Sequence, residues 1–161
     1  MSHVVVVDAD GVRVPLARRR VGDIARAVLR AERSAPARVS ITFVSNGRIA
    51  GLNRRYLGHR GTTDVVSFAL AETLPNVPIA GDIYIAPDVA RRNAEAHGVS
   101  LREELTRLVV HGVLHVLGFD HPAGENRAAS PMWRRQEQLI ATLARRSGRP
   151  RMKRGRTRPA A

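Results

Sequence analysis

The chain of 161 residues contains no cysteine and no long apolar segment. Without cysteine it cannot form disulfides, zinc ribbons, iron–sulfur clusters or a thiol nucleophile. No run approaches the roughly 20 apolar residues that a membrane-spanning helix needs, so we expect no membrane association. The valine run at 4–7 lacks a preceding basic segment and is followed by Asp8 and Asp10, which does not fit a signal peptide. We therefore expect a cytoplasmic protein.

Lysine and aromatic residues are also scarce, and the positive charge is unevenly distributed. Arginine accounts for 26 of the 27 basic residues, and the net charge is +13. Residues 145–161 contain eight basic residues and no acidic one, so they supply most of this excess. Because this segment lacks apolar periodicity, we predict a disordered basic tail at 147–161 and a single domain at 1–146.

The basic tail has two interpretations. As a disordered polyelectrolyte it would bind RNA through phosphate contacts, for which Arg151, Lys153 and Arg154 are the candidates. Alternatively, it is a solvated extension without a partner. We favour contact with RNA or the ribosome. The low aromatic content of 4% predicts few surfaces on which bases stack.

Apolar periodicity and helix-capping residues predict nine elements in the order β–α–β–α–β–β–α–α–α. Ser45 and Ser100 are the predicted N-caps, while Pro87 fits the first turn of a helix that Gly98 closes. A further short strand at 12–15 would return beside the first. Three or four strands with helices gathered late indicate an α+β domain with a small mixed sheet. The predicted strands cover 3–7, 37–45, 64–70 and 81–86, and the predicted helices cover 16–33, 45–56, 87–97, 100–118 and 131–146.

Three histidines within eleven residues, His111, His115 and His121, predict a metal centre. The first two are four residues apart, so they share one face of the helix that we expect to be the longest. Gly118 would end this helix in a left-handed turn and return His121 to the same ion. Three imidazoles leave a fourth position open for water, which is the arrangement of a catalytic zinc site. We therefore predict one Zn²⁺ per chain at the end of this helix.

The spacing H-x-x-x-H-x-x-G-x-x-H is that of metzincin peptidases, which require Glu directly after the first histidine as general base. Here that position is Gly112, which cannot transfer a proton. The residues thus indicate a hydrolytic metal site without the peptidase base.

The segment from His111 to His121, HGVLHVLGFDH, resembles the H-G-x-L-H-L-x-G-Y-D-H signature of the bacterial YbeY family. Residues 52–56 with 63–68, and the segment 81–85 (GDIYI), resemble two further motifs of that family in the same order. The resemblance implies a zinc-dependent, single-strand-specific endoribonuclease of 16S rRNA 3′-end maturation and ribosome quality control. It also implies ribosomal RNA and the small ribosomal subunit as partners, with no DNA substrate.

The chain departs from the family pattern beside the second motif. The family has an arginine after the tyrosine, and here that residue is Leu57. Arg60 is then the candidate catalytic residue, which would stabilise charge on the phosphate, while Arg54 and Arg55 are candidate RNA-binding residues. Asp120 is a candidate acceptor for a histidine N–H.

Other polar residues are interpreted as structural, namely Asp64, Ser67 and Asp82, and Met132 is interpreted as a core residue rather than a Met-turn. Two alternatives to the nuclease remain. One is a metal-dependent hydrolase of another substrate. The other is a non-catalytic, zinc-containing ribosome-assembly factor, which the replacement of the family arginine by Leu57 would favour.

Overall fold

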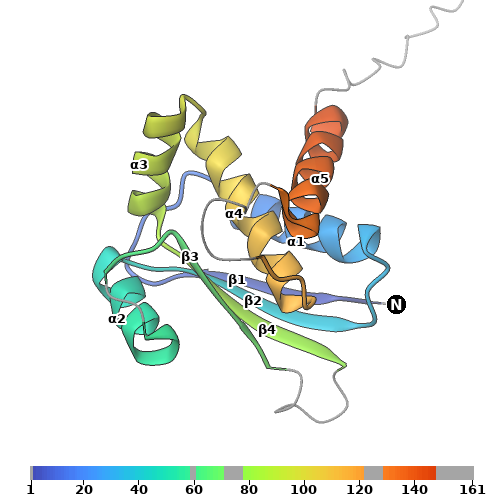
Figure 1. Ribbon diagram of the computed structural model, residues 1–161, viewed down its shortest axis with the longest axis horizontal. Helices are drawn as coiled ribbons and strands as arrows, with labels where there is room; N and C mark the ends of the chain where they lie inside the picture. Colours follow the sequence, from blue (N-terminus) through green and yellow to red (C-terminus); the bar gives the residue numbers. More distant parts are fainter. Residues whose placement is uncertain (1, 59–60, 71–77, 122–128, 148–161) are drawn as a thin grey trace, which may run out of the picture.

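The computed structural model describes residues 2–58, 61–70, 78–121 and 129–147. In this part of the chain, one four-stranded sheet and five helices follow each other in the predicted order (Figure 1). The strands are β1 (Val4–Ala9), β2 (Ala37–Phe43), β3 (Val65–Ala69) and β4 (Ile79–Ile85), and the helices are α1 (Arg18–Ala31), α2 (Asn46–Leu57), α3 (Pro87–His97), α4 (Leu101–Val116) and α5 (Pro131–Ser147). The fold is α+β, as expected.

The sheet is mixed, with the strand order β1-β2-β4-β3. Strands β1, β2 and β4 are parallel, and β3 runs antiparallel to β4. The short return strand predicted at 12–15 is wrong, because these residues form no strand and β1 has only β2 as a neighbour in the described sheet. Val12 and Val14 instead pack, partly buried, against the main core.

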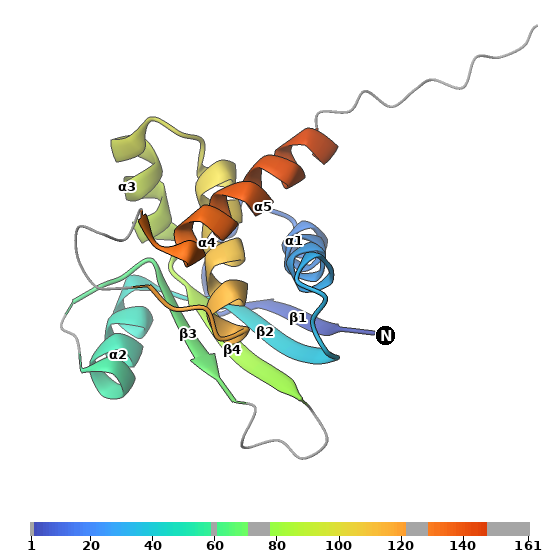
Figure 2. The same ribbon diagram turned by 45° about the vertical axis from the view of Figure 1, so that its right-hand side comes forward.

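The main core lies between one face of the sheet and the helices α1 and α4 (Figure 2). The amphipathic face predicted for α1 is buried there, and β2 alternates inward and outward residues as its sequence indicates. Full burial of an aliphatic side chain contributes roughly 1.5–3 kcal/mol. The buried residues of α1 and β2 therefore stabilise the packing of the helices on the sheet.

The opposite face of the sheet is only partly covered. Ile49 of α2 packs there with Val66 of β3 in a second, smaller cluster. Val4 and Val6 of the edge strand β1 remain 45% and 55% exposed. The helices that matter for the site therefore lie on the other side of the sheet.

Two glycines allow α4 to approach the sheet closely. A Cβ atom at Gly112 would lie 2.8 Å from Cγ2 of Ile83 in β4. A Cβ atom at Gly81 of β4 would lie 2.5 Å from Cγ2 of Val116. The last two turns of α4, which carry two of the predicted ligands, are thus held directly against β4.

The ends of α4 follow the predicted capping residues. The Ser100 side chain accepts a hydrogen bond from the Glu103 N–H at 3.1 Å, and α4 ends at Val116, two residues before the predicted Gly118. With 16 residues, α4 is one residue shorter than α5. None of the helices in the described ranges is both long and apolar enough to cross a membrane.

Candidate metal centre

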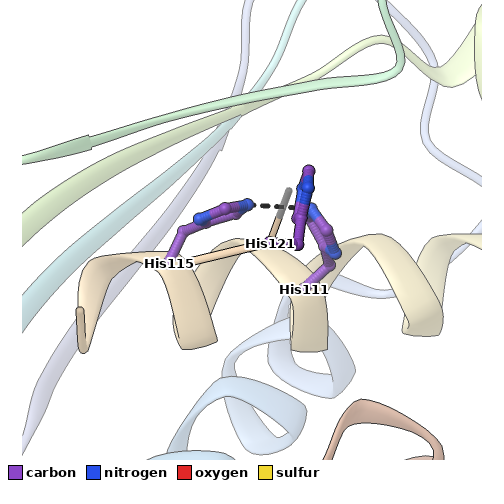
Figure 3. A group of neighbouring side chains, drawn as sticks. All are labelled: His111, His115 and His121. Carbon is purple, nitrogen blue, oxygen red and sulfur yellow. Dashed lines mark hydrogen bonds between the residues drawn. The ribbon is translucent and has the colours of Figure 1, made fainter. Parts of the chain in front are cut away.

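Three imidazole rings meet at the C-terminal end of α4. His111 and His115 project from successive turns of the helix, and His121 follows the turn after it (Figure 3). The ring centroids are 4.6 Å apart for His111 and His115, 5.3 Å for His111 and His121, and 5.0 Å for His115 and His121. One potential ligand atom from each ring lies within 4.8 Å of the other two.

The turn that returns His121 is a Schellman motif. Gly118 has a φ of 96°, a backbone conformation that L side chains rarely adopt. The N–H of Gly118 donates to the carbonyl of His115 at 3.0 Å, and the N–H of Phe119 donates to the carbonyl of Leu114 at 3.0 Å. The predicted left-handed turn is therefore confirmed.

The spacing of the helical pair suits a metal ion. The Nε2 atoms of His111 and His115 are 3.1 Å apart. Two nitrogen ligands at about 2.0–2.1 Å from a tetrahedral ion would be about 3.3–3.4 Å apart. A shift of a few tenths of an ångström therefore brings the pair to ligand geometry.

A glutamine from another helix orients the first histidine. Gln136 of α5 is 1% exposed, and its Oε1 lies 2.7 Å from Nδ1 of His111. Because an amide oxygen only accepts hydrogen bonds, Nδ1 carries the proton, and Nε2 keeps its lone pair for a metal. This arrangement matches the outer hydrogen bonds that orient metal-binding histidines.

His115 is prepared as a neutral ligand. Burial lowers its pKa to about 4, and the neighbouring rings of His111 and His121 act in the same direction. A hydrogen bond with the backbone of Phe119 and the charge of Asp120 oppose this shift in pKa. At neutral pH the ring is therefore deprotonated at one nitrogen, and a metal need not displace a proton from it.

The three residues fit a divalent transition metal. Three neutral imidazoles are the ligand set of zinc sites with an open fourth position, and they also suit copper, iron and nickel. The carbonyl end of α4 adds a partial negative charge that favours a cation there. His111, His115 and His121 would thus hold the ion.

The remaining predicted site residues have different outcomes. The Asp120 carboxylate accepts the backbone N–H of its neighbour His121 at 2.8 Å, so its role as a histidine acceptor stays a prediction. Arg54 and Arg55 are exposed in the last turn of α2, which packs on β3. The guanidinium of Arg55 lies 5.4 Å from the ring centroid of Tyr56. Arg60 and the tail residues Arg151, Lys153 and Arg154 lie outside the described residues.

Several residues that were interpreted as structural have clear contacts. Asp82 accepts a hydrogen bond from the Ser40 hydroxyl at 2.6 Å, and Asp64 accepts one from the Asn93 amide at 3.2 Å. Met132 is buried in the main core, as predicted. Ser67 differs, because its hydroxyl is buried without a hydrogen-bond partner in the described part of the chain.

Gln136 is the site residue that the sequence does not reveal. It lies 25 positions after His111 and on a different helix, in a segment of ordinary amphipathic pattern. Only the packing of α5 on α4 brings the two side chains together.

Comparison with known proteins places the chain among close relatives. The family described as Endoribonuclease YbeY matches residues 10–144. The protein named Endoribonuclease YbeY from Pelotomaculum thermopropionicum is 42% identical over 125 residues, which cover 74% of this chain and 81% of that protein. Its namesake from Thermobifida fusca is 37% identical over 136 residues, covering 80% and 86%. A solution structure from Thermotoga maritima shares the fold, with a TM-score of 0.61, 24% identity, and coverage of 90% of this chain and 94% of that one.

Proposed function

Because this chain belongs to the YbeY endoribonuclease family, as its motifs indicated, we propose that it is a zinc-dependent, single-strand-specific endoribonuclease. Its proposed role is 16S rRNA 3′-end maturation and ribosome quality control in the cytoplasm. The proposed partners are ribosomal RNA and the small ribosomal subunit.

The observation that carries this proposal is the convergence of three histidines, one of which has its tautomer set by a buried amide. When bound, zinc would act as a Lewis acid toward a phosphodiester oxygen and lower the pKa of a water molecule toward 7. The chain itself would keep His115 neutral through burial and would orient His111. Gln136 orients His111 by accepting the hydrogen bond from its Nδ1–H, which leaves Nε2 facing the ion.

The packing of α4 argues against peptide hydrolysis. Gly112 occupies the position of the peptidase glutamate, and a Cβ atom there would overlap Ile83. A longer side chain would therefore point into the sheet rather than toward a substrate. RNA supplies its own 2′-hydroxyl nucleophile, which makes a glutamate base on α4 unnecessary.

Arginines provide the proposed contacts with the strand. Arg54 and Arg55 are exposed and would hold backbone phosphates, and the tail residues Arg151, Lys153 and Arg154 would add contacts that depend steeply on salt. Arg60 would stabilise charge on the cleaved phosphate in place of the family arginine, which here is Leu57.

The test is cleavage of a single-stranded 16S rRNA fragment by the purified full-length protein, with and without a chelator. His115→Ala removes a proposed ligand, and His3→Ala is the matched control, because His3 precedes β1 and is not part of the histidine cluster. We expect cleavage by the wild type and by His3→Ala, and loss of cleavage on chelation and in His115→Ala. Single-stranded DNA of the same sequence should remain intact.

Parallel arms separate the alternatives. Digestion of casein instead of RNA would favour a metal-dependent hydrolase of another substrate. Intact RNA, together with binding to small ribosomal subunits, would favour the assembly factor. Metal content measured after purification and after reconstitution with zinc tests the identity of the ion. The chemistry of the product ends identifies the nucleophile, because 5′-phosphate ends would indicate water.

A further inference from the structure

A cavity of about 400 Å³ adjoins the three histidines. It lies between the start of β3 and the helices α3, α4 and α5, and His111 forms part of its wall. Its volume is within the roughly 300–1,000 Å³ of small-molecule sites. Any ligand in it would therefore lie beside the group that is bound at the metal.

One wall of the cavity carries a carboxylate that accepts no hydrogen bond from the described residues. Glu104 of α4 lies two turns before His111 and is only 6% exposed. Its carboxylate forms no hydrogen bond and no ion pair with the residues that the structure describes. The Glu104 oxygens are not among the fully enclosed polar atoms that lack a partner, so they are open to the cavity, where a ligand can donate hydrogen bonds to them.

The electrostatics of the cavity restrict what it accepts. Asp64 adds a second carboxylate, while Arg107 and His97 line the same cavity and offset part of this negative charge. Within the described ranges, the three histidines are the only ligand cluster close enough to hold a metal, so these carboxylates do not form a second metal site. The acceptor that Glu104 offers to the cavity therefore favours a ligand that donates hydrogen bonds.

An aromatic wall adds a preference for a flat ligand. Trp133 of α5 lines the same cavity, and single-stranded RNA is commonly held by stacking its bases on such side chains. Burial raises the pKa of Glu104 and the nearby charge of Asp64 acts in the same direction, whereas the charges of Arg107 and His97 oppose this shift. A donor-rich ligand would offset both effects.

We propose that this cavity is a nucleobase subsite that accepts guanine next to the cleaved linkage, with Glu104 as acceptor and Trp133 as stacking surface. The proposal rests on the proposed function, because it assumes that RNA is the strand at the metal centre. Guanine presents N1–H and the 2-amino group side by side, which matches the two oxygens of one carboxylate. Adenine and cytosine present one amino group beside a ring-nitrogen acceptor, and uracil presents a single N–H between two carbonyl oxygens.

The single tryptophan of the chain makes direct titration feasible. Fluorescence of the zinc-loaded, full-length protein is followed while GMP, IMP, AMP, CMP or UMP is added. All five share the phosphate, so differences between them report recognition of the base. We expect GMP to bind about tenfold more tightly than IMP, which lacks only the 2-amino group, and than the other three. Equal affinities for GMP and IMP would overturn the assignment of guanine, and no fluorescence change with any nucleotide would overturn the subsite.

Variants then test the residue that carries the recognition. Glu104→Gln should remove the preference for GMP and melt at the same or a higher temperature, because it replaces a buried charge without a partner. The matched control is Glu103→Gln, whose carboxylate is exposed on the same helix and which should keep the preference. A preference for GMP that survives in Glu104→Gln would overturn the proposal. If this variant does not fold, the comparison of GMP with IMP on the wild type decides.

The nucleotide titration and the cleavage assay test the two proposals separately. Preferential binding of GMP without any RNA cleavage would refute the nuclease and leave the base subsite standing. Cleavage of RNA without preference for a base, together with equal nucleotide affinities, would refute the subsite and leave the nuclease standing.

Discussion

Replacing Gln136 tests whether the hydrogen bond to His111 prepares the metal centre. Gln136→Met keeps the length and burial of the side chain but removes the oxygen 2.7 Å from Nδ1 of His111. Loss of such an outer partner typically costs 10–100-fold in metal affinity, or about 1.4–2.7 kcal/mol. Without metal, the ring N–H that loses this acceptor should lower the free energy of unfolding by about 1–3 kcal/mol.

The assay is competition for zinc between the protein and a chromogenic chelator, combined with urea unfolding of the metal-free form. Gln136→Glu retains an acceptor and makes the hydrogen bond charge-assisted, so it should bind zinc at least as tightly as the wild type. Gln138→Met, on the exposed side of α5, is the control and should leave the affinity unchanged. The reasoning is refuted if Gln136→Met binds zinc as tightly as the wild type.

Three further predictions concern stability. Gly112→Ala should lower the free energy of unfolding by about 1–3 kcal/mol in urea titrations, because its Cβ would overlap Ile83. The cost of this overlap exceeds the gain in helix propensity of about 1 kcal/mol. A stabilised variant would contradict the close packing. Because the pKa of His115 falls from 6.5 unfolded to about 4 folded, the metal-free chain should lose stability as the pH drops from about 6.5 to 4. His115→Ala should flatten this dependence in chelator-containing urea titrations, and an unchanged slope would argue against the shift. Ser100→Ala should lower the free energy of unfolding by about 1 kcal/mol, as followed by thermal melting, whereas Ser100→Asp should preserve the cap of α4. Equal melting temperatures of the wild type and both variants would show that the cap contributes nothing to stability.

The packing of α4 explains why a metzincin-like spacing occurs here without the peptidase base. In this fold the residue after the first histidine faces the sheet, where Ile83 leaves room only for glycine. The candidate ligands His111 and His115 lie on another face of the same helix. The histidine spacing and the identity of the base are therefore set by different surfaces of α4.

Local chemistry made much of the site predictable from the sequence. The i, i+4 spacing of His111 and His115 and the left-handed turn at Gly118 depend only on helix geometry and on the freedom of glycine. The N-cap at Ser100 is likewise a contact within three residues, and the order of the nine elements follows from sequence patterns that are local to each element. Features of this kind can be predicted because the residues that form them are close together in the sequence.

Contacts between distant segments were decided only by the tertiary structure. The apolar residues at 12–15 would suit a strand, yet parallel pairing of β1 with β2 leaves them packed against the core. Gln136 acquires its role because α5 crosses α4, and Glu104 and Trp133 share a cavity because four elements enclose it. The sequence thus determined the three candidate ligands and the turn that gathers them. Packing determined which groups orient those ligands and what lies beside them, because no local pattern records partners that are distant along the chain.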